Sequence, residues 1–401
     1  MNILVLNCGS SSVKYKLIEI KANKTLAEGG VEKVGLAGPF IKFKDKGEKI
    51  TKELDITNHT GAIKAILDTL TDSEHGCIKS FDEIDAVGHR VVHGGEKFNK
   101  SVRISDAVIN KVKECYSIAP LHNPVNIAGI EAITSILPNV PQVGVFDTAF
   151  HQTMPAKAYM YAIPYKYYEE DDVRRYGFHG TSHRYVSHRT CEILGLDPDH
   201  NRLISCHIGN GGSICAVKDG KCIDTTMGLT PLEGLMMGTR SGDIDPAAVL
   251  YIMKKEGLTP DQMDHLLNKE SGVLGVTGKS SDMRDIEAGV AAGDKDCILA
   301  LAMYDQRIKK YVGAYLAELG GADAIIFTGG VGENQAITRE TVCSGMEFCG
   351  IKLDKELNAK VHGTETVISA PDSKVKVIVV PTNEELVIAR DTVAIVTGKM
   401  K

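Results

Sequence analysis

The sequence lacks any long apolar segment. No stretch approaches the ~20 consecutive apolar residues of a membrane-spanning helix, so we expect no such helix. The opening residues, MNILVLNCGSSS, contain no basic leader and reach glycine and serine too early for the apolar core of a signal peptide. Low-complexity segments and long linkers are also missing. We therefore expect a cytoplasmic protein. Because no linker separates its parts, we also expect those parts, or lobes, to pack tightly around a cleft.

Neither sign of charge dominates the chain. Lys and Arg number 46 and Asp and Glu 52, which gives a net charge of −6. This mildly acidic balance gives no electrostatic reason to expect nucleic acid or an anionic membrane as a partner. The chain has 401 residues, 43% of them hydrophobic. That length predicts two or three domains and a core large enough to need no disulfides or structural metals.

None of the ten cysteines belongs to a C-x-x-C pair. A chain of this length also has no need of a disulfide framework. We therefore expect free thiols in a reducing cytoplasm.

Two similar hairpins divide the chain. Near the start, Ile3, Val5 and Asn7 alternate with two leucines, a turn of small residues follows at 8–12, and a second strand runs over 13–20. The segment LISCHIGNGGSICAV, beginning at Leu203, repeats this form half a chain later, with its turn at Gly209 to Ser213. The repetition predicts two related lobes.

The rest of the chain alternates between helical and strand patterns, which indicates an α/β fold. A glycine loop, Gly329 to Gly332, is expected after the strand at 324–328. The predicted helices are 58–71, 105–119, 246–256, 260–269, 295–319 and 383–396, and the predicted strands are 86–92, 142–146, 324–328 and 375–380.

Two glycine motifs fail as nucleotide loops. The segment Gly272 to Ser281 resembles a Walker loop, but Val273 stands where its first glycine is needed. The segment GGVGEN resembles a dinucleotide loop, but Gln335 occupies the position of the third glycine. We therefore expect neither a P-loop nor a Rossmann site.

The hairpin turns are better candidates for phosphate binding. Small residues let backbone N–H groups approach phosphate oxygens, and the hydroxyls of Ser10 and Ser12 add donors. Lys14 lies on the same strand face as Ser12 and would supply a point charge. Asn7, at the strand end, offers an amide oxygen to a metal-bound water. A plain hairpin with a serine-rich turn is the alternative.

Nine motifs are spread along the chain: NCGSSSVKYKL, GHRVVHGG, APLHNP, FDTAFH, YGFHGTSH, HIGNGGS, PLEGLMMGTRSGDIDP, FTGGVGENQ and PTNEEL. Together they resemble those of the acetate kinase (acetokinase) family, within the superfamily of acetate and sugar kinases, heat-shock ATPases and actin. The resemblance implies a duplicated two-lobe α/β fold, actin-like and ribonuclease H-like, with ATP in the cleft between the lobes and a homodimer. It implies an N-terminal lobe of residues 1–149 plus 385–401 and a nucleotide-binding C-terminal lobe of residues 150–384.

The implied reaction is reversible: ATP and acetate give ADP and acetyl phosphate, with Mg²⁺, or alternatively Mn²⁺, as the metal. Acetate is already a carboxylate at neutral pH, so the reaction needs no strong general base. The obstacle is electrostatic, because an anion must approach the anionic γ-phosphate. We therefore expect positioning and positive charge to dominate catalysis. Direct transfer and a phosphoenzyme both remain open.

The resemblance assigns the positive charge to two arginines. Arg90 would hold the carboxylate, and Arg240 would stabilise the transition state, because a guanidinium binds carboxylate and phosphoryl oxygens bidentately. His179 matches the histidine that hydrogen-bonds the transferring phosphoryl group. His122 and His207 match positions near substrate and phosphates, although His122 suits a structural role equally well.

Three residues are expected near the metal: Asn7, Asp147 and Glu384. Asp147 acts either as an acid or base or through a magnesium-bound water, and we favour the water because acetate needs no deprotonation. A buried ion pair is the alternative for each carboxylate. His179 and His183 have the i, i+4 spacing of helical zinc ligands, but no third ligand is evident.

The resemblance also identifies substrate contacts. An apolar pocket for the acetate methyl would be lined by Val92, Leu121, Phe178 and Pro231, although each suits an ordinary core position too. Met283 stands where the family often has Phe. Besides Ser10, Ser12 and Lys14, the ATP contacts would be His207, Ile208, Gly209, Asn210, Gly211, Asp282, Met283, Arg284, Gly330, Val331, Gly332, Glu333 and Asn334.

Three other functions compete with this one. A propionate kinase of the same family differs only in substrate length, and a pocket discriminates a methylene by only about 1–3 kcal/mol. A nucleotide-gated binding module, like the heat-shock ATPases, would have no use for Arg90 and Arg240. An actin-like structural role would need filament assembly, for which no sequence feature calls.

Overall fold

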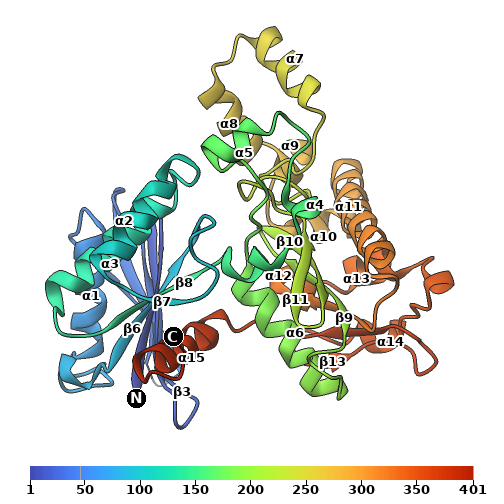
Figure 1. Cartoon of the computed structure of the whole chain (residues 1–401). Helices are drawn as coiled ribbons and strands as arrows, with labels where there is room; N and C mark the ends of the chain where they lie inside the picture. The colour runs from blue at the N-terminus through green and yellow to red at the C-terminus, as the bar shows by residue number, and fades with distance from the viewer. Residues whose placement is uncertain (46, 401) are drawn as a thin grey trace. The chain divides into compact units, whose positions relative to one another are not determined.

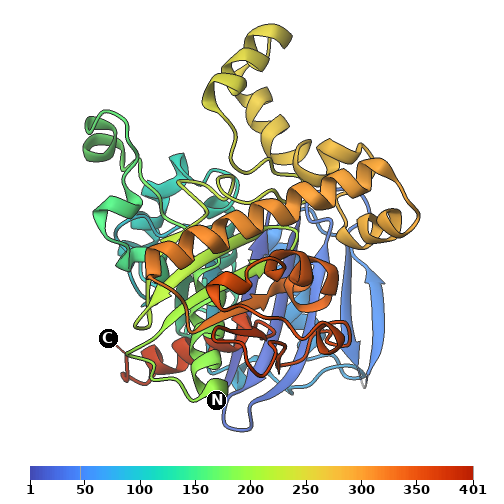
Figure 2. The ribbon, with the colours of Figure 1, turned by 90° about the vertical axis from the view of Figure 1, so that its right-hand side faces the viewer.

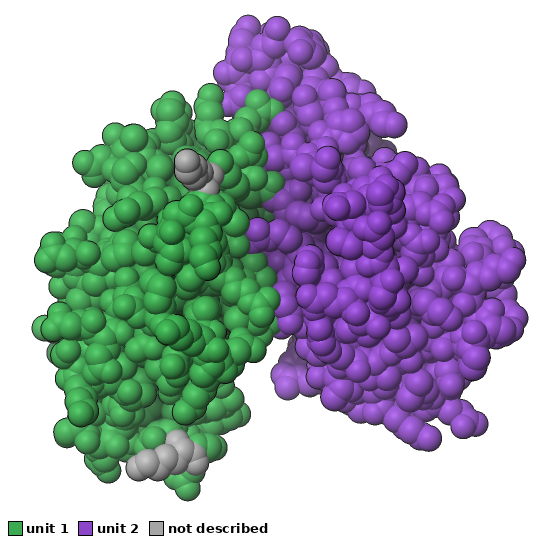
Figure 3. Space-filling model, turned by 60° about the horizontal axis from the view of Figure 1, so that its bottom comes forward, with its two compact units in different colours: residues 1–149, 383–401 green, residues 150–382 purple. Residues whose placement is uncertain are grey.

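The computed structural model describes residues 1–45 and 47–400. The chain divides into two compact units, residues 1–149 with 383–401 and residues 150–382 (Figure 3). The second unit ends at residue 382, two residues before the expected boundary between residues 384 and 385. The reason is local, because Asn383 caps the final helix and its Oδ1 accepts from the backbone N–H of Leu386 at 3.1 Å.

The first unit contains an eight-stranded sheet in the order β5-β4-β3-β2-β1-β6-β8-β7 (Figure 1). β1 pairs antiparallel with β2 and parallel with β6, and β6 pairs parallel with β8. The strands are β1 (Asn2–Gly9), β2 (Ser12–Glu19), β3 (Lys24–Glu32), β4 (Phe40–Asp45), β5 (Glu48–Glu53), β6 (Ala86–Val91), β7 (Val102–Arg103) and β8 (Gln142–Phe146). The helices are α1 (His59–Leu70), α2 (Asp106–Glu114), α3 (Asn123–Ile136) and α15 (Glu384–Val396), with 3₁₀ turns η1 (Phe81–Glu83) and η2 (Cys115–Ser117).

The predicted alternation of β1 is confirmed by what each face packs against. Leu4 and Leu6 belong to a core with α1 and α3. Ile3 and Val5 pack instead with residues of α15, including Ile388. Side chains alternate along a strand, so Asn7, which follows Ile3 and Val5 in this series, lies on the face of β1 that packs against α15.

The second unit contains a six-stranded sheet in the order β11-β10-β9-β12-β14-β13. The strands are β9 (Arg202–Ile208), β10 (Gly212–Lys218), β11 (Lys221–Thr225), β12 (Ala324–Thr328), β13 (Thr366–Val367) and β14 (Lys376–Val379). The helices are α4 (Ala156–Tyr159), α5 (Lys166–Asp171), α6 (Gly180–Leu194), α7 (Pro246–Glu256), α8 (Pro260–Lys269), α9 (Gly272–Thr277), α10 (Met283–Ala291), α11 (Lys295–Leu319), α12 (Gly329–Asn334), α13 (Ala336–Cys343) and α14 (Lys355–Asn358), with η3 (Ala149–Thr153) and η4 (Glu347–Cys349).

Helices cover both faces of this second sheet. Ile204 and Cys206 of β9 face a large core shared with α11, which runs across the sheet in Figure 2. Leu203 and Cys215 face the opposite way, in a core shared with Val186 of α6. Within residues 1–45 and 47–400, every helix is too short or too polar to cross a bilayer.

The two units share one strand order. The five strands β3-β2-β1-β6-β8 of the first sheet match β11-β10-β9-β12-β14 of the second, with antiparallel and parallel pairings in the same places. The prediction of two related α/β lobes is therefore confirmed. The hairpin turns differ, since Gly9 pairs with Ser12 in the first unit while Ile208 pairs with Gly212 in the second.

Local sequence signals placed several elements correctly. Helix α8 begins and ends at the predicted residues, and its start is fixed because Thr259 and Gln262 form a capping box around Pro260. The predicted glycine loop after β12 is wrong, because Gly329 to Asn334 form helix α12. Glu333 stabilises its start by accepting from the backbone N–H of Gly329 at 2.9 Å.

Helix α11 carries a buried acid. Asp305 is 2% exposed, and its Oδ1 has no hydrogen-bond partner among the described residues. Burial raises the pKa of Asp305 to about 6, although Thr338 and Thr341 act to lower it. The folded-state pKa thus exceeds the unfolded one, so the acid's contribution to stability is present below about pH 4 and is lost as pH rises through about 6.

Replacing Asp305 with asparagine is therefore expected to stabilise the protein at pH 8 by about 1–3 kcal/mol, because the buried charge is removed. The gain should shrink at pH 5, where the native acid is largely protonated. Urea unfolding of both proteins at the two pH values measures the difference. A difference that does not change with pH would contradict the assignment.

Candidate active site

Charged side chains gather at the carboxyl ends of β6 and β8 in the first unit. Arg90, near the end of β6, donates from Nε to Asp147 Oδ1 at 3.0 Å and from Nη2 to Oδ2 at 2.6 Å. Asp147 directly follows β8 and is only 1% exposed. Burial acts to lower the pKa of Arg90, but the charge of Asp147 outweighs it, and the guanidinium stays cationic. Both side chains were predicted, but as members of separate motifs.

Two further predicted residues lie beside this ion pair. Asn7 Oδ1 accepts from Arg90 Nη1 at 3.4 Å. Glu384 opens α15, and burial raises its pKa to about 7, with Arg90 lowering the pKa and Asp147 and Glu385 raising it. Three carboxylates therefore act on one guanidinium, and this excess of negative charge favours a cation.

The first hairpin presents its polar residues on one face. Ser12 and Lys14 share a face of β2, as predicted, and Lys14 is the cross-strand partner of Asn7. Ser10 lies in the exposed turn between the strands. Lys14 also lines a groove of about 480 Å³ that includes Lys16 of the same strand.

The predicted apolar residues of the first unit differ in exposure. Val92 is 7% exposed, and its backbone N–H donates to Asn126 Oδ1 at 2.9 Å. Leu121 is 55% exposed, so a core role is excluded for it. His122 occupies the N-cap position of α3, although its side chain makes no capping hydrogen bond there.

In the second unit two predicted histidines stack on each other. The rings of His179 and His207 lie 4.2 Å apart, centre to centre, at 17°. His179 precedes α6 with a left-handed backbone, φ +57°, which is uncommon for a residue with a side chain. Ser182 fixes the second ring, because its Oγ lies 2.8 Å from His207 Nδ1.

His183 does not face its i−4 neighbour as a zinc ligand would. Its Nδ1 lies 2.8 Å from Ser205 Oγ, and its Nε2 lies 3.0 Å from Ser213 Oγ. Both ring nitrogens are therefore engaged by hydroxyls of the sheet. Burial lowers the pKa of His183, and the nearby His151 and His207 lower it further.

Arg240 lies next to these histidines and to the second hairpin. A Cβ at Gly211 would lie 3.0 Å from Arg240 Nη2 and 3.4 Å from His179 Nε2, so glycine lets both side chains approach the turn a few tenths of an ångström more closely. Arg240 Nη1 donates to the carbonyl of Pro231 at 2.7 Å. Burial lowers the pKa of Arg240, and no carboxylate of the described residues forms an ion pair with it.

A cavity of about 670 Å³ lies in the second unit, beyond the turn of the second hairpin. It is bounded by that turn, the start of α10 and the start of α12. Its predicted lining residues are Gly209, Asn210, Asp282, Met283, Arg284, Gly330, Val331 and Asn334. Three others were missed, Ser281, Glu287 and Gln335, of which Ser281 and Gln335 directly adjoin predicted residues.

Other predicted nucleotide residues do not line the cavity. Ile208 and Gly332 are buried in the sheet and in α12. The carboxylate of Glu333 is engaged by backbone, since its Oε1 also accepts from the N–H of Thr382 at 3.1 Å.

The start of α10 forms one side of the cavity. Asp282 caps this helix and accepts from the side chain of Arg284, whose hydrogen bond lowers the pKa of Asp282 to about 2. Met283 is 7% exposed, and its carbonyl accepts from Gln335 Nε2 at 3.2 Å. A buried, apolar Met283 beside polar neighbours suits a flat ring with hydrogen-bonding edges.

Known protein sequences and structures match this chain over nearly its whole length. The sequence model of the Acetokinase family matches residues 2–390. An acetate kinase of Phocaeicola vulgatus is 64% identical over 396 residues, 98% of this chain and 99% of that protein. The crystal structure of Porphyromonas gingivalis acetate kinase has a TM-score of 0.95 at 59% identity, covering 98% of this chain and 99% of that one. A propionate kinase structure from Francisella tularensis has a TM-score of 0.91 at 43% identity, covering 98% of each chain.

Proposed function

The chain belongs to the acetokinase family, and from this premise we propose that it catalyses reversible phosphoryl transfer from ATP to acetate, giving ADP and acetyl phosphate. Relatives named acetate kinase reach 64% identity, whereas the propionate kinase structure stands at 43%. This difference favours acetate over propionate as the preferred substrate.

The observation that carries the proposal is the environment of Arg240. Its guanidinium is half-buried, lies against Gly211 and His179, and among the described residues donates only to the neutral carbonyl of Pro231. A partly buried cation without a counter-charge is unfavourable, and an arriving anion offsets that cost. Arg240 is therefore assigned to the phosphoryl oxygens, where negative charge builds up during transfer.

Arg90 is assigned to the carboxylate of acetate. Asp147 occupies its Nε and Nη2, which fixes the plane of the guanidinium. Its Nη1 makes only a long contact of 3.4 Å to Asn7. That nitrogen is thus the donor most available to a substrate carboxylate.

Asp147 is assigned first to holding Arg90, a role that needs no proton transfer. Oδ2 accepts from both Nε and Nη2 of Arg90, whereas Oδ1 accepts from Nε and keeps a second lone pair, so a magnesium-bound water at Oδ1 remains compatible with the ion pair. Neither role requires Asp147 to act as an acid or base, in keeping with the ionised state of acetate.

The nucleotide is assigned to the cavity beside α10 and α12. Met283 would pack against the base, and the N–H groups of the Gly209 turn and of the α12 start would meet the phosphates. His179, stacked on His207, would donate to the transferring group. Ser10, Ser12 and Lys14 of the first hairpin are assigned to phosphate contacts as well.

Mg²⁺ fits the residues of the first unit. Asn7 and Glu384 supply the oxygen ligands that this ion prefers, and the surplus of carboxylates around Arg90 attracts a divalent cation. When bound, the ion would neutralise charge on the phosphates. Mn²⁺ is the alternative ion with the same ligand preference.

Apolar residues are assigned to the acetate methyl. Phe178 is 2% exposed and rigidly held, since its carbonyl accepts from the ring of His151 at 2.9 Å. Leu121 is exposed and available for contact, and Val92 and Pro231 complete the set. His122 is assigned to the same substrate end.

We further propose a cytoplasmic homodimer. The cytoplasmic location is proposed because ATP, the proposed substrate, is a cytoplasmic nucleotide. Helix α7 supports an interface between two copies of the chain. None of its residues is buried, and its large apolar side chains Leu250 and Tyr251 are 56% and 66% exposed. Figure 1 shows α7 and α8 projecting from the sheet of their unit.

Hydroxylamine trapping of acyl phosphate tests the function. With ATP and Mg²⁺, acetate should give the most product, propionate less and butyrate little, since each added methylene must fit a closed pocket. Chelation of the metal should abolish the product. A propionate maximum would instead identify a propionate kinase. Acetate-independent ATP hydrolysis without acyl phosphate would contradict the proposal.

A further inference from the structure

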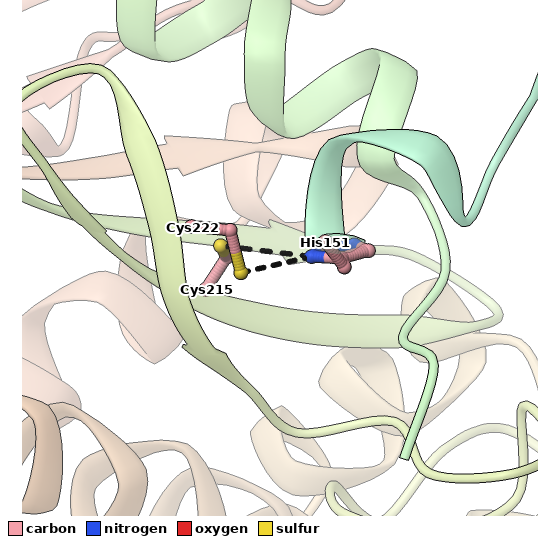
Figure 4. Close-up of side chains that lie close together, drawn as sticks. All are labelled: His151, Cys215 and Cys222. Carbon is pink, nitrogen blue, oxygen red and sulfur yellow. Dashed lines mark hydrogen bonds between the residues drawn. The ribbon is translucent and has the colours of Figure 1, made fainter. Parts of the chain in front are cut away.

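Three buried side chains with metal-binding atoms converge in the second unit, apart from the residues assigned above. They are His151 of η3, Cys215 of β10 and Cys222 of β11, each 0% exposed. Figure 4 shows the imidazole and the two thiols pointing toward one another from three elements. Their ligand atoms all lie within 4.8 Å of one another.

The distances suit a shared ion. His151 Nδ1 lies 3.1 Å from Cys222 Sγ and 4.0 Å from Cys215 Sγ. In a tetrahedral zinc site, with Zn–S of about 2.3 Å and Zn–N of about 2.0–2.1 Å, nitrogen and sulfur ligands lie about 3.6 Å apart. The two observed nitrogen–sulfur distances bracket this value, so shifts of about half an ångström would place all three atoms at ligand distances from one ion.

The imidazole is oriented as metal-binding imidazoles are. Its Nε2 lies 2.9 Å from the carbonyl of Phe178, which can only accept, so Nε2 carries a proton. Nδ1 therefore faces the two sulfurs. A histidine ligand whose other N–H is held by a backbone carbonyl is the arrangement that fixes tautomer and ring direction in metal sites.

The sheet places both thiols on one face by means of a bulge. Cys215 pairs with Thr225 and Cys222 pairs with Val217, and the register shifts between Ala216 and Val217. This shift inserts one extra residue into β11. Without the extra residue, Cys222 would point to the opposite face of the sheet. Both cysteines are free, and their sulfurs lie within 4.8 Å of each other and of the imidazole nitrogen.

Both thiols must lose their protons to act as ligands, because thiolate is the form that binds metal ions. A cation held between the two buried sulfurs supplies the positive charge that stabilises both thiolates.

We propose that His151, Cys215 and Cys222 form a binding site for a thiophilic d¹⁰ cation, zinc(II) or copper(I), inside the second unit. Two sulfurs and one nitrogen are the donor set that selects such ions over magnesium. Binding releases the thiol protons to solvent. The ion also fixes His151 and, through it, the carbonyl of Phe178, which immediately precedes His179.

Metal titration of the whole protein tests the site. Protein stripped with chelator is titrated with Zn²⁺ and, anaerobically, with Cu⁺, and bound metal is counted after gel filtration. We expect one equivalent per chain. Co²⁺ substitution should give the near-ultraviolet sulfur-to-metal charge-transfer band that thiolate ligation produces.

Variants locate the binding. Cys215→Ala, Cys222→Ala and His151→Gln should each weaken binding at least about 100-fold. Cys343→Ala removes another buried thiol, 2% exposed, and should bind as the unchanged protein does. If a variant misfolds, thermal melting of the unchanged protein still tests for binding, because an ion that binds the folded protein raises its Tm as the ion concentration increases.

Three results would overturn the proposal. One is the absence of stoichiometric binding of either ion, and another is binding that survives all three substitutions. The third is a Cys215–Cys222 disulfide in the protein under reducing conditions, found by peptide mass mapping, which would identify a redox pair instead.

Discussion

Replacing Arg240 with alanine is expected to lower kcat for acetyl phosphate formation by about 10³-fold. The guanidinium is assigned to charge that develops in the transition state, and loss of such a group costs about this factor. ATP affinity should change little, because Arg240 does not line the cavity assigned to the nucleotide. The effect should therefore appear in kcat far more than in the KM for ATP.

Steady-state kinetics and calorimetric ATP binding measure the two effects. Calorimetry is the suitable method, since the chain contains no tryptophan for fluorescence. Arg240→Lys keeps the charge but not the fork, and should recover only part of the rate. Arg202→Ala serves as a control, because that side chain pairs with Asp323 at the surface. Turnover near that of the unchanged enzyme in Arg240→Ala would remove its assigned role.

Replacing Arg90 with alanine is expected to raise the KM for acetate by about 10²-fold and to lower kcat as well. A charge-assisted hydrogen-bond donor, Arg90 Nη1, is lost from the substrate carboxylate. The same change leaves Asp147, 1% exposed, without its partner, and an unpaired buried charge costs about 3–5 kcal/mol. The variant should therefore also unfold at a lower temperature.

The double variant Arg90→Ala, Asp147→Asn separates binding from folding. Removing both charges should restore much of the Tm, while the KM for acetate stays high. Asp147→Asn alone retains Arg90 and should show a smaller increase in KM. If that single variant instead raises the magnesium requirement, the metal-bound water is its main contact. Recovery of normal acetate affinity in the double variant would contradict the role of Arg90.

The elements that the sequence predicted are those whose signals are local. Proline at the first turn and a capping pair define α8, and alternating apolar residues define β1. The repeat of the hairpin form was enough to predict two related lobes. The helix at Gly329 was missed, because its start is stabilised by Glu333, whose carboxylate also bonds the distant Thr382.

The candidate site divides in the same way. Short motifs identified Arg90, Asp147, His179 and Arg240 as candidates, and eight residues of the cavity wall. They carried no information on how these residues meet. The pairing of Arg90 with Asp147 joins strand ends 57 residues apart in sequence, and only the parallel packing of β6 and β8 brings them together.

By itself the sequence determined the α/β class, the internal duplication, the family resemblance and the chemical types of the reacting groups. These depend on periodicity, caps and short motifs, all of which act over a few residues. Only the tertiary structure decided that Asp147 is committed to Arg90, that half-buried Arg240 has no ion-pair partner among the described residues, and that His151 meets two cysteines 64 and 71 residues away. Charge compensation and ligand geometry depend on distances through space, which packing of the sheets and helices sets.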